Sequence, residues 1–161
     1  MSKILHVRAL EALSDEQWKE LRQLEVSKRQ EVMGKSFLES IEDWELAPKD
    51  RVLGLCFLID QSPVGLVLFR KQVGPEIGSI SVHGLKIALP WQRQGYGHQA
   101  FREAVEYVKR KWPNAKLLNL AVDAENKPAV AVYRGFGMAD SGPVFDGPNG
   151  KEHHMKMSLI S

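Results

Sequence analysis

The feature that most constrains the fold of this chain is the stretch Leu85–Ala100, where an apolar run leads through two glycines into a helical pattern. The run stops at Pro90, and Gly95 and Gly97 stand just before the helical pattern begins. This order predicts a strand, a tight loop and a helix start. The first N–H groups of a helix have no intrahelical partner and carry partial positive charge, so the loop is a predicted anion site, beside the cation of Arg93.

Size and charge restrict the class of protein. The 161 residues are 43% hydrophobic and 26% charged, which predicts one domain over residues 1–161. A formal charge of +2, with acids and bases interspersed, predicts no nucleic-acid partner. The single cysteine, Cys56, lies in an apolar run, so we expect a buried thiol and a cytoplasmic location. Neither a signal peptide nor a membrane span is expected, and the sequence leaves monomer and homodimer open.

The first half of the chain predicts helices followed by hairpin strands. A helix is expected to begin at Ser14, whose side chain forms a capping box with Gln17. Period and turn residues predict the other elements, which are a strand at 3–8, a short helix at 36–44, a hairpin of strands 52–59 and 64–71, and a strand at 77–89.

The second half predicts one crossover and a last hairpin. The expected elements are a helix at 98–112, a strand at 117–122, a helix at 126–134 and paired strands at 138–145 and 152–160. The whole order predicts an α/β or α+β fold, with a mixed, mostly antiparallel sheet of about seven strands and about four helices.

The glycines alone leave several interpretations open. Gly95-x-Gly97-x-x-Ala100 also fits the dinucleotide-binding fingerprint, with Asp123 near the position of the ribose-binding acid. Against this, the motif follows an antiparallel meander, and the 38 residues after Asp123 are too few for a doubly wound sheet. A tight turn with no ligand is the purely structural alternative.

A longer pattern around the glycines points to a family. Leu85-x-Ile87-x-x-x-x-Gln92-x-x-Gly95-x-Gly97 resembles the signature of the GNAT superfamily of N-acetyltransferases, in which this loop closes on the pyrophosphate of coenzyme A.

A second pattern lies downstream at the family's separation. Asn126-x-x-Ala129-x-x-x-Tyr133-x-x-x-Gly137-Met138 is similar to the family's second motif, which usually ends in Phe. The order of elements resembles the family from about residue 3 to residue 160.

The resemblance implies an acetyl-CoA-dependent N-acetyltransferase that moves the acetyl group directly to a primary amine, a small molecule, without a metal. It implies that strands 77–89 and 117–122 splay apart and hold the pantetheine arm between them. The backbone of Leu85 and Ile87 then binds the pantetheine amides. The remaining cofactor contacts that it implies are Asn126 on the pantetheine and, on the pyrophosphate, the amides of Arg93, Gln94, Gly95, Tyr96, Gly97 and His98.

Two residues are candidates for proton transfer. The family's spacing makes Tyr133 the general acid that protonates the leaving thiolate, although a packing tyrosine is the structural alternative. His83 is the candidate base, as in the similar arylalkylamine acetyltransferases, and a purely structural histidine is its alternative. Strand alternation predicts that His83 shares a face with Ser81, Leu85 and Ile87.

The sequence constrains the amine acceptor less than it constrains the cofactor. Ala121 replaces a glutamate found in members that acetylate protein N-termini, and no carboxylate lies between Ile77 and Leu89, which speaks against a lysine-acetylating type. Specificity is expected in the segment 27–48, which is acidic, and in the terminal hairpin. A non-catalytic acyl-CoA-binding module is a further alternative, and a dinucleotide-binding protein a third.

Overall fold

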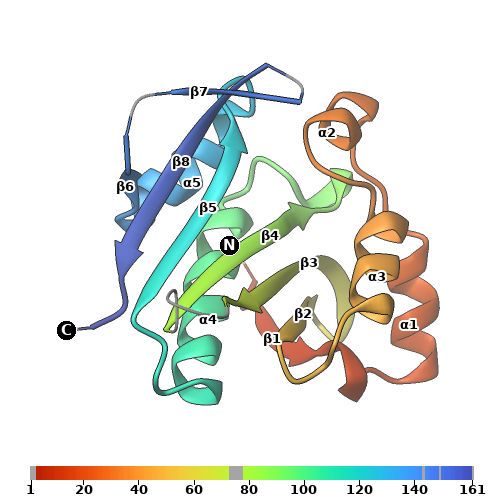
Figure 1. The fold of residues 1–161 in the computed structure, drawn as a ribbon. Helices are drawn as coiled ribbons and strands as arrows, with labels where there is room; N and C mark the ends of the chain where they lie inside the picture. Colours follow the sequence, from red (N-terminus) through yellow and green to blue (C-terminus); the bar gives the residue numbers. More distant parts are fainter. Residues whose placement is uncertain (1–2, 73–77, 143, 149, 161) are drawn as a thin grey trace.

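One mixed sheet organises the chain, which the computed structural model describes over residues 3–72, 78–142, 144–148 and 150–160. Its strand order is β1-β2-β3-β4-β5-β8-β6, with β7 also paired to β8 (Figure 1). Among the described strands only β4 and β5 are parallel neighbours. The strands are β1 (His6–Ala9), β2 (Val52–Ile59), β3 (Ser62–Lys71), β4 (Ser79–Ile87), β5 (Leu117–Asp123), β6 (Ala139–Asp140), β7 (Phe145–Gly147) and β8 (Gly150–Ser158).

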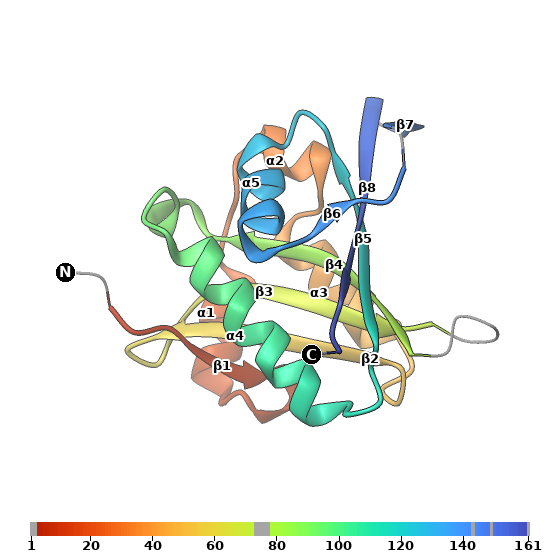
Figure 2. The same cartoon turned by 90° about the vertical axis from the view of Figure 1, so that its left-hand side faces the viewer.

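Helices cover both faces of this sheet. The α-helices are α1 (Asp15–Arg22), α2 (Lys28–Met33), α3 (Phe37–Leu46), α4 (Tyr96–Lys111) and α5 (Lys127–Phe136). Figure 2 shows α4 and α5 in front of the sheet and α1 and α3 behind it. Each side has its own core, with Phe101 of α4 in one cluster and Phe37 of α3 in the other. No helix in the described ranges is long and apolar enough to cross a membrane.

The expected α/β architecture is confirmed, with one helix more than predicted. The capping box of Ser14 with Gln17 begins α1 as predicted. Helix α2 was missed because it has six residues and buries none of them, so it leaves no apolar periodicity. Its start does carry a sequence signal, since Ser27 forms a capping box with Gln30.

The terminal hairpin differs from the prediction in its first strand. The expected strand at 138–145 is divided into β6 and β7, both antiparallel to β8. The two short segments together pair with five residues of β8, namely Lys156, Met155, Glu152, Lys151 and Gly150. Residue 149 of the expected turn lies outside the described residues, as does Ile77 at the expected start of β4.

Strands β4 and β5 separate toward their carboxyl ends. Their parallel pairing runs only from Ser79 beside Leu117 to Ser81 beside Asn119, although β4 continues to Ile87 and β5 to Asp123. Figure 1 shows the two strands diverging above this point. The predicted splay is therefore present in the sheet.

A bulge at Gly84 reverses the alternation of β4, so the predicted shared face is confirmed for Ser81 and His83 and is wrong for Leu85 and Ile87. Between two paired positions β4 advances by three residues, from His83 to Lys86, while β3 advances by two. Gly84 has φ +67°, a left-handed conformation that suits glycine. Beyond it Leu85 and Ile87 pack on the α4 side of the sheet. His83 instead lies on the α3 side, with Lys86.

Candidate active site

A cavity of about 500 Å³ extends from the splayed part of β4 to the N-terminal end of α4. Its walls come from β4, from the loop before α4 and from α5. Most of the predicted cofactor residues line it, namely Leu85, Ile87, Arg93, Gly95, Gly97, His98 and Asn126.

The loop before α4 adopts the tight conformation expected of an anion site. Gly95 is the N-cap of α4 with φ +86°, and an added Cβ would meet no atom within 4 Å. Arg93 also has positive φ, +60°, which is uncommon for a residue with a side chain. At Gly97 an added Cβ would come within 3.2 Å of Val132 Cγ2, so the absence of a side chain lets α4 approach α5. The first amides of α4 are thus left at the cavity wall.

The motif residue Gln92 holds the loop against the strand that precedes it. Its Nε2 donates to the carbonyl oxygen of Ile87 at 2.8 Å and to Gln30 Oε1 at 3.1 Å. The Gln30 amide donates in return to Gln92 Oε1 at 3.2 Å. Gln30, from the missed helix α2, therefore belongs to the supporting structure of this cavity.

Asn126 caps α5 beside the same cavity. Its Oδ1 accepts a hydrogen bond from the Ala129 amide at 3.4 Å, which gives this residue a structural role as the N-cap. The other two predicted residues, Gln94 and Tyr96, do not line the cavity. Gln94 Nε2 donates to the Pro90 carbonyl, and Tyr96 is buried, with its hydroxyl accepting from the Lys3 amide. The prediction for these two residues concerned only their backbone amides, and it stays a prediction.

A second cavity, of about 790 Å³, adjoins the first on the α3 side of the sheet. Its lining includes residues of the segment from the end of α2 to Pro48 and residues of β3, β4 and β5. Pro148 and Glu152 of the terminal hairpin also line it. The two cavities share Gly34, Lys35 and Gly84, so they meet at the bulge of β4. Of the four acidic residues in the segment 39–45, only Asp43 lines this cavity, paired with Lys35 at 2.6 Å.

His83 lies in the wall of the larger cavity. Its Nε2 is 2.8 Å from Ser81 Oγ. Partial desolvation lowers the pKa of His83 below its usual value, and the cations of Arg70 and Lys35 lower it further, against the opposing effect of Asp43. The histidine is therefore neutral near pH 7 and able to accept a proton.

Tyr133 lies deeper than a cavity residue. Its side chain is 6% exposed and packs edge-on against Phe101, with ring centroids 5.1 Å apart. It is absent from the linings of both cavities, and among the described residues nothing hydrogen-bonds its hydroxyl. Burial raises the pKa of Tyr133 well above its usual value. Its packing role is thus evident, and its role as an acid stays a prediction.

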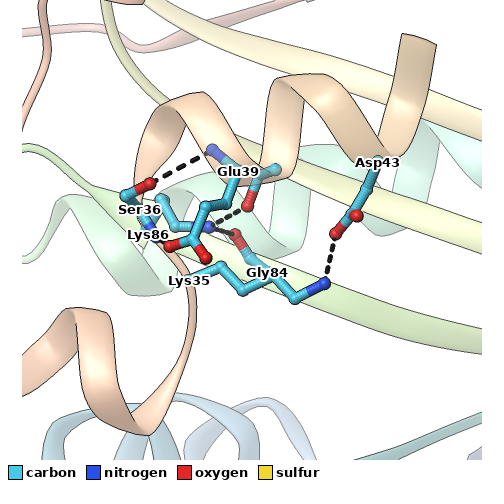
Figure 3. Close-up of polar contacts among 7 residues, drawn as sticks. Lys35, Ser36, Glu39, Asp43, Gly84 and Lys86 are labelled. Carbon is cyan, nitrogen blue, oxygen red and sulfur yellow. Dashed lines mark hydrogen bonds and ion pairs between the residues drawn. The ribbon is translucent and has the colours of Figure 1, made fainter. Parts of the chain in front are cut away.

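Lys86 is a site residue that the sequence did not reveal. It is only 8% exposed, lines the smaller cavity, and donates to Ser40 Oγ at 2.6 Å and to the Gly84 carbonyl at 2.7 Å (Figure 3). Burial lowers the pKa of Lys86 to about 8. Regular alternation would place residue 86 on the α4 side, so only the bulge brings this lysine to α3.

The dinucleotide interpretation conflicts with this geometry. Asp123 lines the larger cavity, whereas Gly95 and Gly97 line the smaller one. A doubly wound sheet is mostly parallel, whereas the described strands contain one parallel pair. Within the described ranges, no group of three or more His, Cys, Asp or Glu side chains could hold a metal ion.

A splayed sheet with a cavity that ends on a glycine-rich helix start defines an α/β protein built to bind an anionic cofactor. The sequence matches the profile of the Acetyltransferase (GNAT) family over residues 11–138. The chain therefore belongs to the GNAT acetyltransferase family, which confirms the expected family and its acyltransferase class. A comparison with curated protein sequences finds no match.

Solved structures agree with the fold. The spermidine N-acetyltransferase from Vibrio cholerae, in complex with CoA and spermine, superposes with a TM-score of 0.73 at 20% identity, covering 96% of this chain and 95% of that one. The aminoglycoside acetyltransferase AAC(6')-Ib in complex with coenzyme A superposes with a TM-score of 0.72 at 14% identity, covering 96% of this chain and 95% of that one. An acetyltransferase of the GNAT family from Streptococcus pneumoniae gives 0.69 at 17% identity, covering 97% and 99%. Coenzyme A in two of these structures agrees with the expected cofactor.

Proposed function

We propose that this protein transfers the acetyl group of acetyl-CoA to the primary amine of a small molecule, within one ternary complex. The observation that carries the proposal is the meeting of two cavities at Gly84. The smaller cavity ends on the amides of α4, which suit a pyrophosphate, and the larger one has room for a separate acceptor. Donor and acceptor can then meet at the bulge without a covalent enzyme intermediate.

Side chains near the junction suit the proton transfers. His83, neutral near pH 7, is proposed to take the proton of the attacking amine, directly or through a water. Tyr133 is proposed to protonate the thiolate, in line with its place in the second motif. Because Tyr133 lines neither cavity, this role requires the acyl end of the cofactor to reach beyond the cavity lining toward the phenol.

The acceptor class is proposed as a small amine. The spermidine N-acetyltransferase structure contains spermine, and a structure of AAC(6')-Ib contains the aminoglycoside ribostamycin. The larger cavity of this chain carries Asp43, Asp123 and Glu152 together with Lys35 and Arg70. The proposal includes a single domain and a cytoplasmic location, in keeping with the free, buried Cys56.

A thiol-release assay with acetyl-CoA tests the proposal. Polyamines, aminoglycosides, arylalkylamines, amino acids and peptides serve as acceptors, and we expect acceptor-dependent release of CoA with at least one of the small amines. Release with peptides alone would contradict the small-molecule acceptor. Bound acetyl-CoA without release across the panel would favour the non-catalytic acyl-CoA-binding module.

A further inference from the structure

Lys86 is a buried cation without an anionic partner. Its Nζ donates to a hydroxyl and a carbonyl, both neutral, and lies 5.8 Å from the centre of the Phe37 ring. Among the described residues no carboxylate lies within ion-pair distance of it. Asp43 pairs with Lys35, and Glu39 accepts from the Ser36 amide in the capping box of α3 (Figure 3). A buried ammonium of this kind loses its proton readily.

The charged groups around Lys86 do not restore the pKa of an ordinary lysine. Burial is the largest effect on its pKa, which falls to about 8; Asp43 and Glu39 raise the pKa, and Lys35 lowers it. At pH 7.5 a group of this pKa is about one quarter neutral, against about one part in a thousand for an ordinary lysine. The neutral amine has two N–H donors, which the Ser40 hydroxyl and the Gly84 carbonyl can take. Its lone pair is then not engaged by either bond.

Lys86 also lies at the end of the cavity where an acyl group is expected. In the proposed function, the pyrophosphate is held near Gly95 and Gly97, at the start of α4. The acyl thioester must then lie at the opposite end, where the smaller cavity meets the larger one at Gly84. The ammonium of Lys86 is at this junction, because a Cβ added to Gly84 would come within 3.1 Å of its Nζ.

From this geometry we propose that Lys86 is a self-acetylation site, which takes one acetyl group from bound acetyl-CoA when no acceptor is present. The inference rests on the proposed function. The lone pair of Nζ attacks the thioester carbon, the N–C bond forms and the C–S bond breaks. Coenzyme A leaves as a thiolate and takes up the proton that Nζ loses, so the products are an N-acetyl-lysine and the CoA thiol.

Acetylation changes the contacts at the bulge. An N-acetylated lysine has one N–H donor, so it cannot donate to both Ser40 Oγ and the Gly84 carbonyl. The link between α3 and β4 is then weakened at the point where the two cavities meet. Self-acetylation therefore slows later acceptor turnover.

The chain offers a matched control in Lys35. It lines both cavities, as Gly84 does, but its side chain is exposed and its ammonium is paired with Asp43. It is at least as reachable as Lys86 and differs from it in burial and in its counter-ion. Proximity to acetyl-CoA alone would label Lys35 as well, whereas the proposed chemistry selects Lys86.

The test is incubation of the intact protein with ¹³C-labelled acetyl-CoA and no acceptor, followed by intact mass and peptide mapping. We expect one acetyl group per chain on Lys86, added at least ~10-fold faster than on Lys35 and faster at pH 8.5 than at pH 7. The K86R variant should lose the label, K35R should keep it, and excess CoA should suppress it.

Three results would overturn the inference. One is comparable labelling of many exposed lysines, which is chemical acetylation. The second is an unlabelled Lys86 in wild-type protein that binds and turns over acetyl-CoA, which leaves the proposed function standing. The third is a protein whose melting temperature does not rise with acetyl-CoA and in which Lys86 is not acetylated. In that case both the inference and the proposed function fail. Mapping in the wild-type protein keeps the test decisive even if K86R does not fold.

Discussion

At the scale of single residues, Tyr133 connects packing with chemistry. We predict that Tyr133→Phe lowers kcat by at least ~10-fold, because general-acid catalysis commonly contributes more than that. The Kd of acetyl-CoA should change less than about twofold, since the predicted pyrophosphate and pantetheine contacts belong to other residues, which line the smaller cavity. Steady-state kinetics and a binding titration measure the two quantities. Tyr96→Phe is the control, because that buried hydroxyl bonds the Lys3 amide instead. Unchanged turnover in Tyr133→Phe would remove this residue from the mechanism.

His83 makes a prediction about pH. A base must be unprotonated to act, and the pKa of His83 lies below its usual value, so activity should persist below pH 6.5 and fall only in more acidic solution. In His83→Gln the rate should drop and this acidic limb of the profile of kcat/KM should disappear. His6→Gln, in the exposed start of β1, should keep the limb. A limb that persists in His83→Gln would assign the proton to another group.

At the scale of an element, the start of α4 depends on backbone conformation. Gly95 has φ +86°, and the left-handed conformation costs a residue with a Cβ roughly 1–2 kcal/mol. Since an added Cβ has open space, we predict that Gly95→Ala lowers the melting temperature by roughly 2–8 °C through strain alone. Gly95→Asn should lose less, because asparagine tolerates this conformation better. Thermal unfolding of the three proteins measures the difference, and equal losses for Ala and Asn would point to another cause.

The elements around the cofactor cavity differ in how far the sequence predicts them. The strand, loop and helix of β4 and α4 follow from local signals, namely glycines at a helix start and an apolar helical face. Helix α2 lacks such a face because all of its side chains reach solvent at least in part. Its only signal, Ser27 with Gln30, is the same pattern that identified α1, so the capping box alone would have found it.

At the scale of the whole molecule, the cofactor should stabilise the fold because its predicted site joins β4, α4 and α5. A ligand at 100 times its Kd adds about 2.7 kcal/mol to the free energy of unfolding. For a chain of this size we predict a rise in melting temperature of roughly 5–10 °C with acetyl-CoA and no rise with NAD(H). Differential scanning fluorimetry with both ligands gives the comparison. Stabilisation by NAD(H) and none by acetyl-CoA would revive the dinucleotide interpretation.

The sequence by itself determined the family, the order of the main elements and the loop of the cofactor cavity, because these depend on local chemistry. Helix caps, positive φ at glycine and a 3.6-residue period act over a few residues and can be recognised in the printed chain. Asn126 is an example, since its capping of α5 needs only the next three residues.

Only the tertiary structure decided which side chains meet at the junction of the two cavities. The bulge at Gly84 shifts the register by one residue, and this single step moves His83 away from Leu85 and turns Lys86 toward Ser40. The low pKa of Lys86 and the burial of Tyr133 follow from helices packed on opposite faces of the sheet. Desolvation depends on everything that surrounds a group, so no local pattern of residues records it.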